Sequence, residues 1–129
     1  MKTVFIFCVM LVFGCSQKEN ATLKKAAAIQ IESFSALDSI ERTIQSLTNI
    51  PALTDSIKKI ESEVAQWETE MIDIPGYEST HLEHNHSHSQ KIEELTPEQM
   101  LSVQQELKQQ LTHIHIRLKK LQTDYAKSF

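Results

Sequence analysis

Apolar residues recur at steps of three and four along most of the chain, the spacing of one face of an α-helix. Between Thr22 and Thr48 this stripe comprises Leu23, Ala27, Ile31, Phe34, Leu37, Ile40, Ile44 and Leu47. Between Ala52 and Ile72 the steps alternate strictly between four and three, through Leu53, Ile57, Ile60, Val64, Trp67, Met71 and on to Ile74. Pro51 separates the two segments, because proline disfavours the helical conformation of the residue before it. Each stripe predicts a helix that packs against a partner.

A third helix has the clearest start in the chain. Thr96 is a good N-cap, Pro97 suits the first helical position, and Gln99 completes a capping box. The apolar stripe of this helix continues through Met100, Val103, Leu107, Leu111, Ile114, Leu118, Leu121 and Tyr125. Three amphipathic helices of similar length predict an all-α fold, an up-down-up three-helix bundle over residues 22–129.

The predicted connection between the second and third helices, residues 73–95, is unusually long. Helix–helix connections in bundles take ~2–8 residues, and loops beyond ~15 residues are commonly functional or disordered. Pro75 and Gly76 predict a turn at its start. The length of this loop makes it the candidate functional segment of the chain.

The N-terminal segment has a different pattern. Val4–Phe13 is an unbroken apolar run behind Lys2, and it is shorter than the ~20 residues that span a bilayer, which favours a signal peptide. The residues Val12-Phe13-Gly14-Cys15 resemble a bacterial lipobox. The resemblance implies a lipoprotein signal peptide cleaved after residue 14, fatty acylation (palmitate) at Cys15, and a lipid-anchored linker over residues 15–21. A signal cleaved elsewhere and a retained N-terminal anchor are the alternatives.

This resemblance also implies a location and a partner. Several acyl chains on one cysteine give a stable anchor, so the expected partner is a membrane of the bacterial cell envelope. Ser16 after the cysteine, in place of Asp, favours the outer membrane by resemblance to envelope lipoproteins. Cys8 leaves with the signal peptide, so the mature chain has no thiol for a disulfide. The chain is acidic, with 13 Lys and Arg against 17 Asp and Glu, which gives no electrostatic case for nucleic acid.

The candidate chemistry lies within the long loop. Four of the six histidines of the chain fall between residues 81 and 88, namely His81, His84, His86 and His88. The last three alternate, so an extended backbone places them on one side. Imidazole is a good ligand for zinc and copper, and Glu78 or Glu83 can add an oxygen ligand. Histidine-rich tracts are compositional pointers to metal binding, and three interpretations stay open: a physiological site for zinc or copper, adventitious binding, and no metal role.

Two family resemblances are present. The sequence "LTPEQM" at Leu95–Met100 resembles the LTxxQ signature of small periplasmic helical stress proteins. The lipobox, Trp67, "DIPGYE" at Asp73–Glu78, the histidines and "LTPEQM" together resemble small uncharacterised Bacteroidota helical lipoproteins with a His-rich insert, sometimes labelled "viral A-type inclusion protein". The likeness covers about half the chain, and it implies a helical envelope lipoprotein without implying an activity.

Two functions follow from these residues, and neither is enzymatic. The first is a membrane-anchored protein that captures transition-metal ions through its acidic, His-rich loop. The second is a helical scaffold, interaction or chaperone-like lipoprotein with no metal role, whose partner is another envelope protein or a second copy. Ile116 favours the second, because it lies opposite the apolar stripe of its helix and is expected to be exposed. We expect the remaining histidines, His113 and His115, to be ordinary helix-surface residues.

Overall fold

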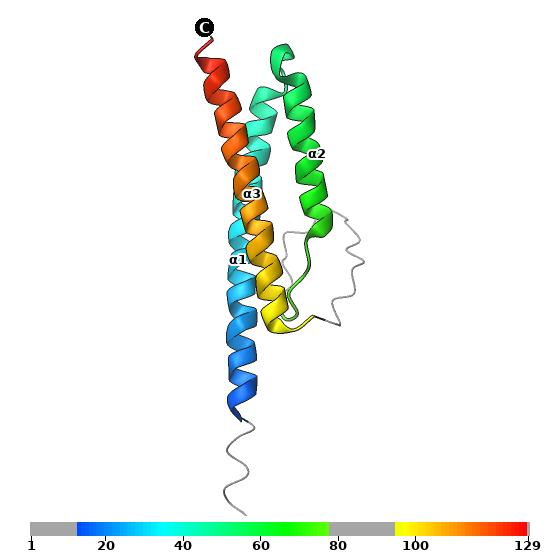
Figure 1. Cartoon of the computed structure of the whole chain (residues 1–129), viewed down its shortest axis with the longest axis vertical. Helices are drawn as coiled ribbons and strands as arrows, with labels where there is room; N and C mark the ends of the chain where they lie inside the picture. The colour runs from blue at the N-terminus through cyan, green and yellow to red at the C-terminus, as the bar shows by residue number, and fades with distance from the viewer. Residues whose placement is uncertain (1–12, 78–94, 129) are drawn as a thin grey trace, which may run out of the picture.

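The computed structural model of the protein describes residues 13–77 and 95–128. Three long helices occupy most of them: α1 (Phe13–Leu47), α2 (Thr54–Glu70) and α3 (Pro97–Ala126), with a short 3-10 turn, η1 (Pro51–Leu53), leading into α2. Helices α1 and α3 run in the same direction and α2 runs against them (Figure 1). The predicted all-α three-helix bundle is thus confirmed for these residues, whereas most of the predicted loop, residues 78–94, lies outside them.

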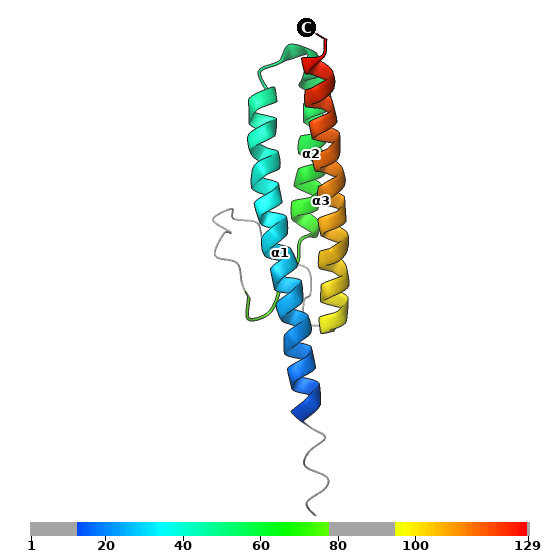
Figure 2. The same ribbon diagram turned by 90° about the vertical axis from the view of Figure 1, so that its left-hand side faces the viewer.

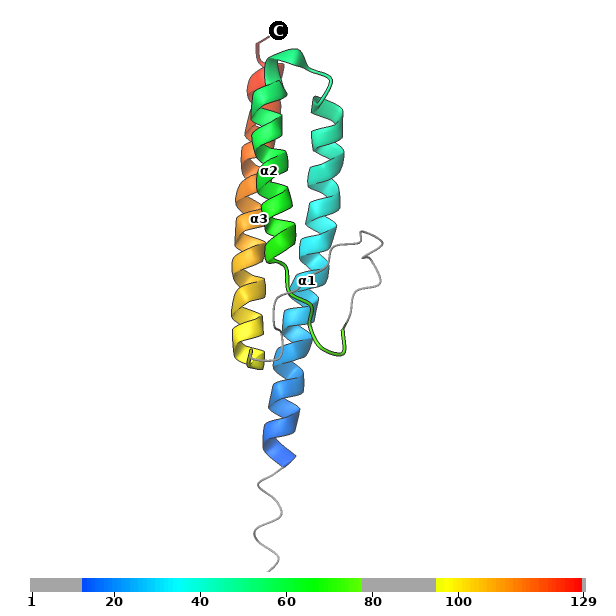
Figure 3. The ribbon, with the colours of Figure 1, turned by 90° about the vertical axis from the view of Figure 1, so that its right-hand side faces the viewer.

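The most extensive contact is between α1 and α3, and α2 contacts α3 more than it contacts α1. Figure 2 shows α1 and α3 side by side with α2 behind them, and Figure 3 shows α2 in front of α3. Trp67 is central to the core, where its indole N–H donates to the Leu107 carbonyl at 2.7 Å. The ring of Phe34 meets the Trp67 indole edge-on, with centroids 6.3 Å apart. A single buried aromatic side chain of α2 therefore contacts both other helices.

The buried seams follow the predicted heptad spacing, with three corrections. Ile31 was predicted to be core but is 63% exposed, and the buried residue of that turn is Gln30. A shift of one residue turns a side chain by ~100° around the helix axis, which carries Ile31 out of the seam. In α3, Val103 is only half-buried and Gln104 is fully buried in its place. In α1, Ser33 is likewise buried and the predicted Phe34 is half-buried beside it. All three corrections put a polar residue into the seam next to the apolar residue that was predicted for it.

The helix boundaries are partly as predicted. The Thr96 capping box is present, since its hydroxyl accepts from the Gln99 N–H at 3.3 Å and the Gln99 side chain accepts from the Thr96 N–H at 2.8 Å. Helix α1 begins at Phe13 and not at Thr22, so residues 15–21, which we expected to form a linker, are helical. Helix α2 ends at Glu70 and not at Ile72. The chain then continues as an extended segment.

This extended segment, Met71–Tyr77, is called the strap below. Met71, Ile72 and Ile74 are buried, and the last two join Ala26, Ala27 and Met100 in a small cluster at the lower end of the bundle in Figure 1. The strap thus takes the place of α2 between the lower halves of α1 and α3. It continues the apolar spacing of α2 in an extended conformation.

Candidate functional site

The predicted metal ligands lie between two ends that the structure describes. Glu78, His81, Glu83, His84, His86 and His88 are all outside the described residues. The chain before them ends in the strap, and the chain after them begins at Leu95. The geometry of these two ends is therefore what the fold contributes to the site.

The strap is held at its centre by two buried amides. The carbonyl of Ile72 accepts hydrogen bonds from the side-chain amides of Gln30 on α1 and Gln104 on α3, each at 2.9 Å. The Gln30 amide also lies 3.6 Å from the Met71 sulfur. An extended chain has no helical partner for its carbonyls, and a buried carbonyl without a donor is costly. The two glutamines supply these donors, which explains their positions in the seams.

A tight turn closes the strap. The Tyr77 N–H donates to the Ile74 carbonyl at 2.9 Å, and Gly76 between them has φ +78°. Proline followed by a residue with positive φ is typical of a type II turn, and glycine adopts this conformation without steric cost. The turn predicted at Pro75 and Gly76 is confirmed.

The chain that follows residues 78–94 is also packed against the bundle. Leu95 is half-buried and packs against the lower cluster, and the next residue, Thr96, caps α3. Both ends therefore meet the bundle at its lower end, beside the part of α1 that contacts Met100. The described residues on either side of residues 78–94 thus belong to the same end of the bundle.

Two buried oxygen atoms near this region have no hydrogen-bond partner among the described residues. They are Oδ1 of Asp73, in the strap, and Oε1 of Gln104. Both are acceptors, so their surroundings suit a hydrogen-bond donor or a cation and disfavour an anion. Glu68, Glu70 and Glu98 add exposed or half-buried carboxylates on the elements that lead into and out of the segment. Lys24 and Lys25 of α1, next to Ala26 of the lower cluster, are exposed cations, so the described residues at this end carry charges of both signs.

The described residues form no ready-made metal site: within them, no group of three or more His, Cys, Asp or Glu side chains is placed to hold an ion. His113 is exposed and His115 is half-buried on the flank of α3, as predicted.

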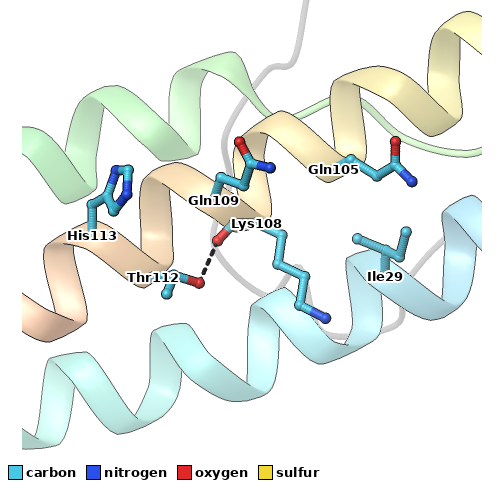
Figure 4. Close-up of a pocket in the computed structure, with 6 residues that line it drawn as sticks. All are labelled: Ile29, Gln105, Lys108, Gln109, Thr112 and His113. Atoms are coloured by element: carbon cyan, nitrogen blue, oxygen red, sulfur yellow. Dashed lines mark hydrogen bonds between the residues drawn. The ribbon is translucent and has the colours of Figure 1, made fainter.

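A shallow depression between α1 and α3 is lined by Ile29, Gln105, Lys108, Gln109, Thr112 and His113 (Figure 4).

Two of the polar side chains that line this depression, those of Lys108 and Thr112, have partners on the neighbouring helix or on their own helix. The Thr112 hydroxyl donates to the Lys108 carbonyl at 2.8 Å, and the Lys108 ammonium pairs with Glu32 of α1. Thr112 and His113 are adjacent in a helix, so their side chains do not face each other. The six lining residues thus offer no activated nucleophile, and we assign the depression no chemistry.

Cys15, the predicted lipidation site, lies in the first turn of α1. In the part of the chain that the structure describes, no helix combines the length and apolar character needed to cross a bilayer. The signal peptide predicted for residues 1–14 lies outside the described residues except for its last two positions.

The chain matches no family model, and no curated protein or solved structure matches it. The residues themselves are therefore the basis for a function.

The sequence did not lead us to predict that Gln30 and Gln104 hold the strap. A signal was present, because strict heptad steps from Ile40 and Leu111 arrive at these two positions.

Proposed function

We propose that this protein is a bacterial envelope lipoprotein, anchored in the outer membrane through Cys15, that captures transition-metal ions through its His-rich segment. The observation that carries the proposal is the concentration of four histidines within residues 81–88, in a segment whose two ends are fixed in the bundle. The expected ions are zinc and copper, because imidazole nitrogen suits both.

Fixing the ends of the segment supports this function energetically. Ordering a chain to bind an ion costs conformational free energy, and the cost of closing a loop rises with its length. The strap and the α3 cap fix the chain on both sides of residues 78–94 at the same end of the bundle, which lowers the cost of closing a loop around an ion.

The proposed role is capture and not catalysis. Catalytic zinc sites use ligands on ordered elements, each oriented by further hydrogen bonds. Here the candidate ligands are closely spaced and interchangeable, and Glu78 and Glu83 are the nearest oxygen donors in the sequence. The acidic composition of the chain gives no reason to propose a nucleic-acid partner.

A titration tests this proposal directly. Purified protein is titrated with zinc and with copper by calorimetry, beside a variant in which His81, His84, His86 and His88 are alanine. The matched control is the His113→Ala/His115→Ala protein, which loses two helix-surface histidines and keeps the segment. We expect the four-fold variant to lose binding and the control to retain it. Equal curves for all three proteins would refute metal capture by this segment. Elemental analysis of protein isolated from its native membrane identifies the ion.

A second candidate function, a scaffold that binds another envelope protein or a second copy of this chain, is favoured by exposed apolar residues. Ile116 on α3 is 60% exposed, as predicted, and Ile31 on α1 is 63% exposed. Crosslinking in cells is compared between the native protein and Ile116→Asp, with Ile31→Asp as a second variant. Loss of a crosslinked species in either variant supports the scaffold, and an unchanged pattern in both counts against these surfaces.

A further inference from the structure

Helix α1 continues beyond the bundle at its lower end. In Figure 1 its first turns project past the start of α3. The first residue of α1 that packs against the core is the half-buried Leu23, and the first fully buried one is Ala26. We call residues 16–22 the stalk. Lys18, Glu19, Asn20 and Ala21 of the stalk are all exposed.

The stalk is helical because it is continuous with a packed helix. Isolated short helices are unstable in water chiefly because the first turn is costly to form, whereas extending an existing helix adds one hydrogen bond per residue. No glycine or proline interrupts the chain from Cys15 to Ile50. The Thr22 hydroxyl donates to the Lys18 carbonyl at 3.1 Å, within the same helix. The stalk therefore needs no partner in order to form.

The sequence of the stalk excludes two other roles for it. Heptad steps backward from Leu23 arrive at Glu19 and Ser16, so the apolar seam ends at Leu23 and no partner helix is required. A helix that lies in a membrane interface needs a wide apolar face, and Ala21 is the only apolar residue of the stalk. What remains is a solvated helix that joins the anchor to the bundle.

We propose that the stalk is a rigid spacer that holds the lower end of the bundle at a fixed height above a lipid surface. This inference rests on the proposed anchorage at Cys15. The rise from Cys15 to Leu23, where α1 first packs against the bundle, is about 12 Å for an upright helix at ~1.5 Å per residue. The headgroup layer of one leaflet is ~5–8 Å thick, so the lower end of the bundle clears it by about 4–7 Å, which is less than the Debye length of ~8 Å. The strap and the start of α3 then stand close to the membrane without entering it.

The spacer is tested on the acylated full-length protein in vesicles of phosphatidylethanolamine and phosphatidylglycerol. Apart from Cys15 the mature chain has no thiol, so a single added cysteine can be labelled specifically. Ser102→Cys, at an exposed position of α3, carries a fluorescent donor. Energy transfer from this donor to acceptor lipids reports its height above the membrane. One variant duplicates residues 16–22, and its control inserts seven Gly and Ser residues at the same point. Seven helical residues add ~10 Å and nearly two full turns.

We expect the duplication to raise the donor by about 10 Å with a narrow distance distribution, and the Gly/Ser insertion to give a broad one. Equal distributions for the two insertions, or no rise for the duplication, would overturn the spacer. Mass spectrometry of Cys15 in the same preparations, with Cys15→Ala as control, separates the two proposals. Absence of acylation refutes the anchor itself, whereas acylated protein with equal distributions refutes the spacer alone.

Discussion

The side-chain amides of Gln30 and Gln104 donate to the same carbonyl, that of Ile72. We therefore predict that the unfolding free energies lost on replacing the two glutamines are not additive. Gln30→Met and Gln104→Met each remove one donor and keep the approximate length of the side chain. After either single change the carbonyl retains the other amide. After both changes it stays buried, in a residue that is 5% exposed, without a donor.

The magnitudes follow from these contacts. Loss of one hydrogen bond costs about 0.5–1.5 kcal/mol, whereas a buried group left without a partner costs about 1–3 kcal/mol. Gln30→Met is expected to cost about 1 kcal/mol. Gln104→Met also removes the buried Oε1 that has no partner among the described residues, so its net effect is about zero. The double variant adds the orphaned carbonyl, which predicts an unfavourable coupling of about 1–2 kcal/mol.

Urea unfolding of the four proteins, with Cys15→Ala in all of them to prevent acylation, measures this coupling as a double-mutant cycle at constant m-value. The control cycle uses Gln45→Met in the last turn of α1 and Gln105→Met in the first half of α3, two exposed positions that are far apart because the two helices run in the same direction. Distant or independent sites add within about 0.3–0.5 kcal/mol. A coupling within that range for Gln30 and Gln104 would refute the shared carbonyl as the anchor of the strap.

Four further measurements follow from the structure. Trp67→Phe should lower the unfolding free energy by about 1–3 kcal/mol, because it removes the hydrogen bond to Leu107 and some buried volume; a loss below 0.5 kcal/mol in urea unfolding would contradict that contact. Thr96→Ala should cost about 1 kcal/mol through loss of the capping box, and an unchanged urea midpoint would argue against the cap. Ile31→Lys should change stability by less than about 0.5 kcal/mol, whereas Ile40→Ala should cost about 2–5 kcal/mol; similar costs for the two would show that Ile31 is core after all. Zinc affinity should fall as the pH is lowered through ~6.5, the usual pKa of imidazole, because a ligating imidazole has to be neutral, and a calorimetric affinity that is flat across this range would point to carboxylate ligands.

The sequence by itself determined the features that depend on local chemistry. The start of α3 follows from the order Thr96, Pro97 and Gln99, whose capping geometry involves only neighbouring residues. The seam of α2 was predicted residue by residue, because all its members are large and apolar and their spacing admits one buried face. The turn at Pro75 and Gly76 was also predicted, because its conformation depends only on these two residues and their immediate neighbours. The concentration of histidines is also a property of sequence alone, and its chemistry stays a prediction.

Only the tertiary structure decided where the apolar spacing stops belonging to a helix. The apolar spacing of α2 runs on to Ile74 without a break, yet the helix stops at Glu70 and the chain becomes a strap. The buried carbonyl of Ile72 requires donors from other elements, which is why Gln30 and Gln104 occupy the seams and Ile31 is displaced to solvent. A pattern of apolar residues records that a side is buried, but the partner that buries it, helix or extended chain, is fixed by contacts between residues far apart in the sequence.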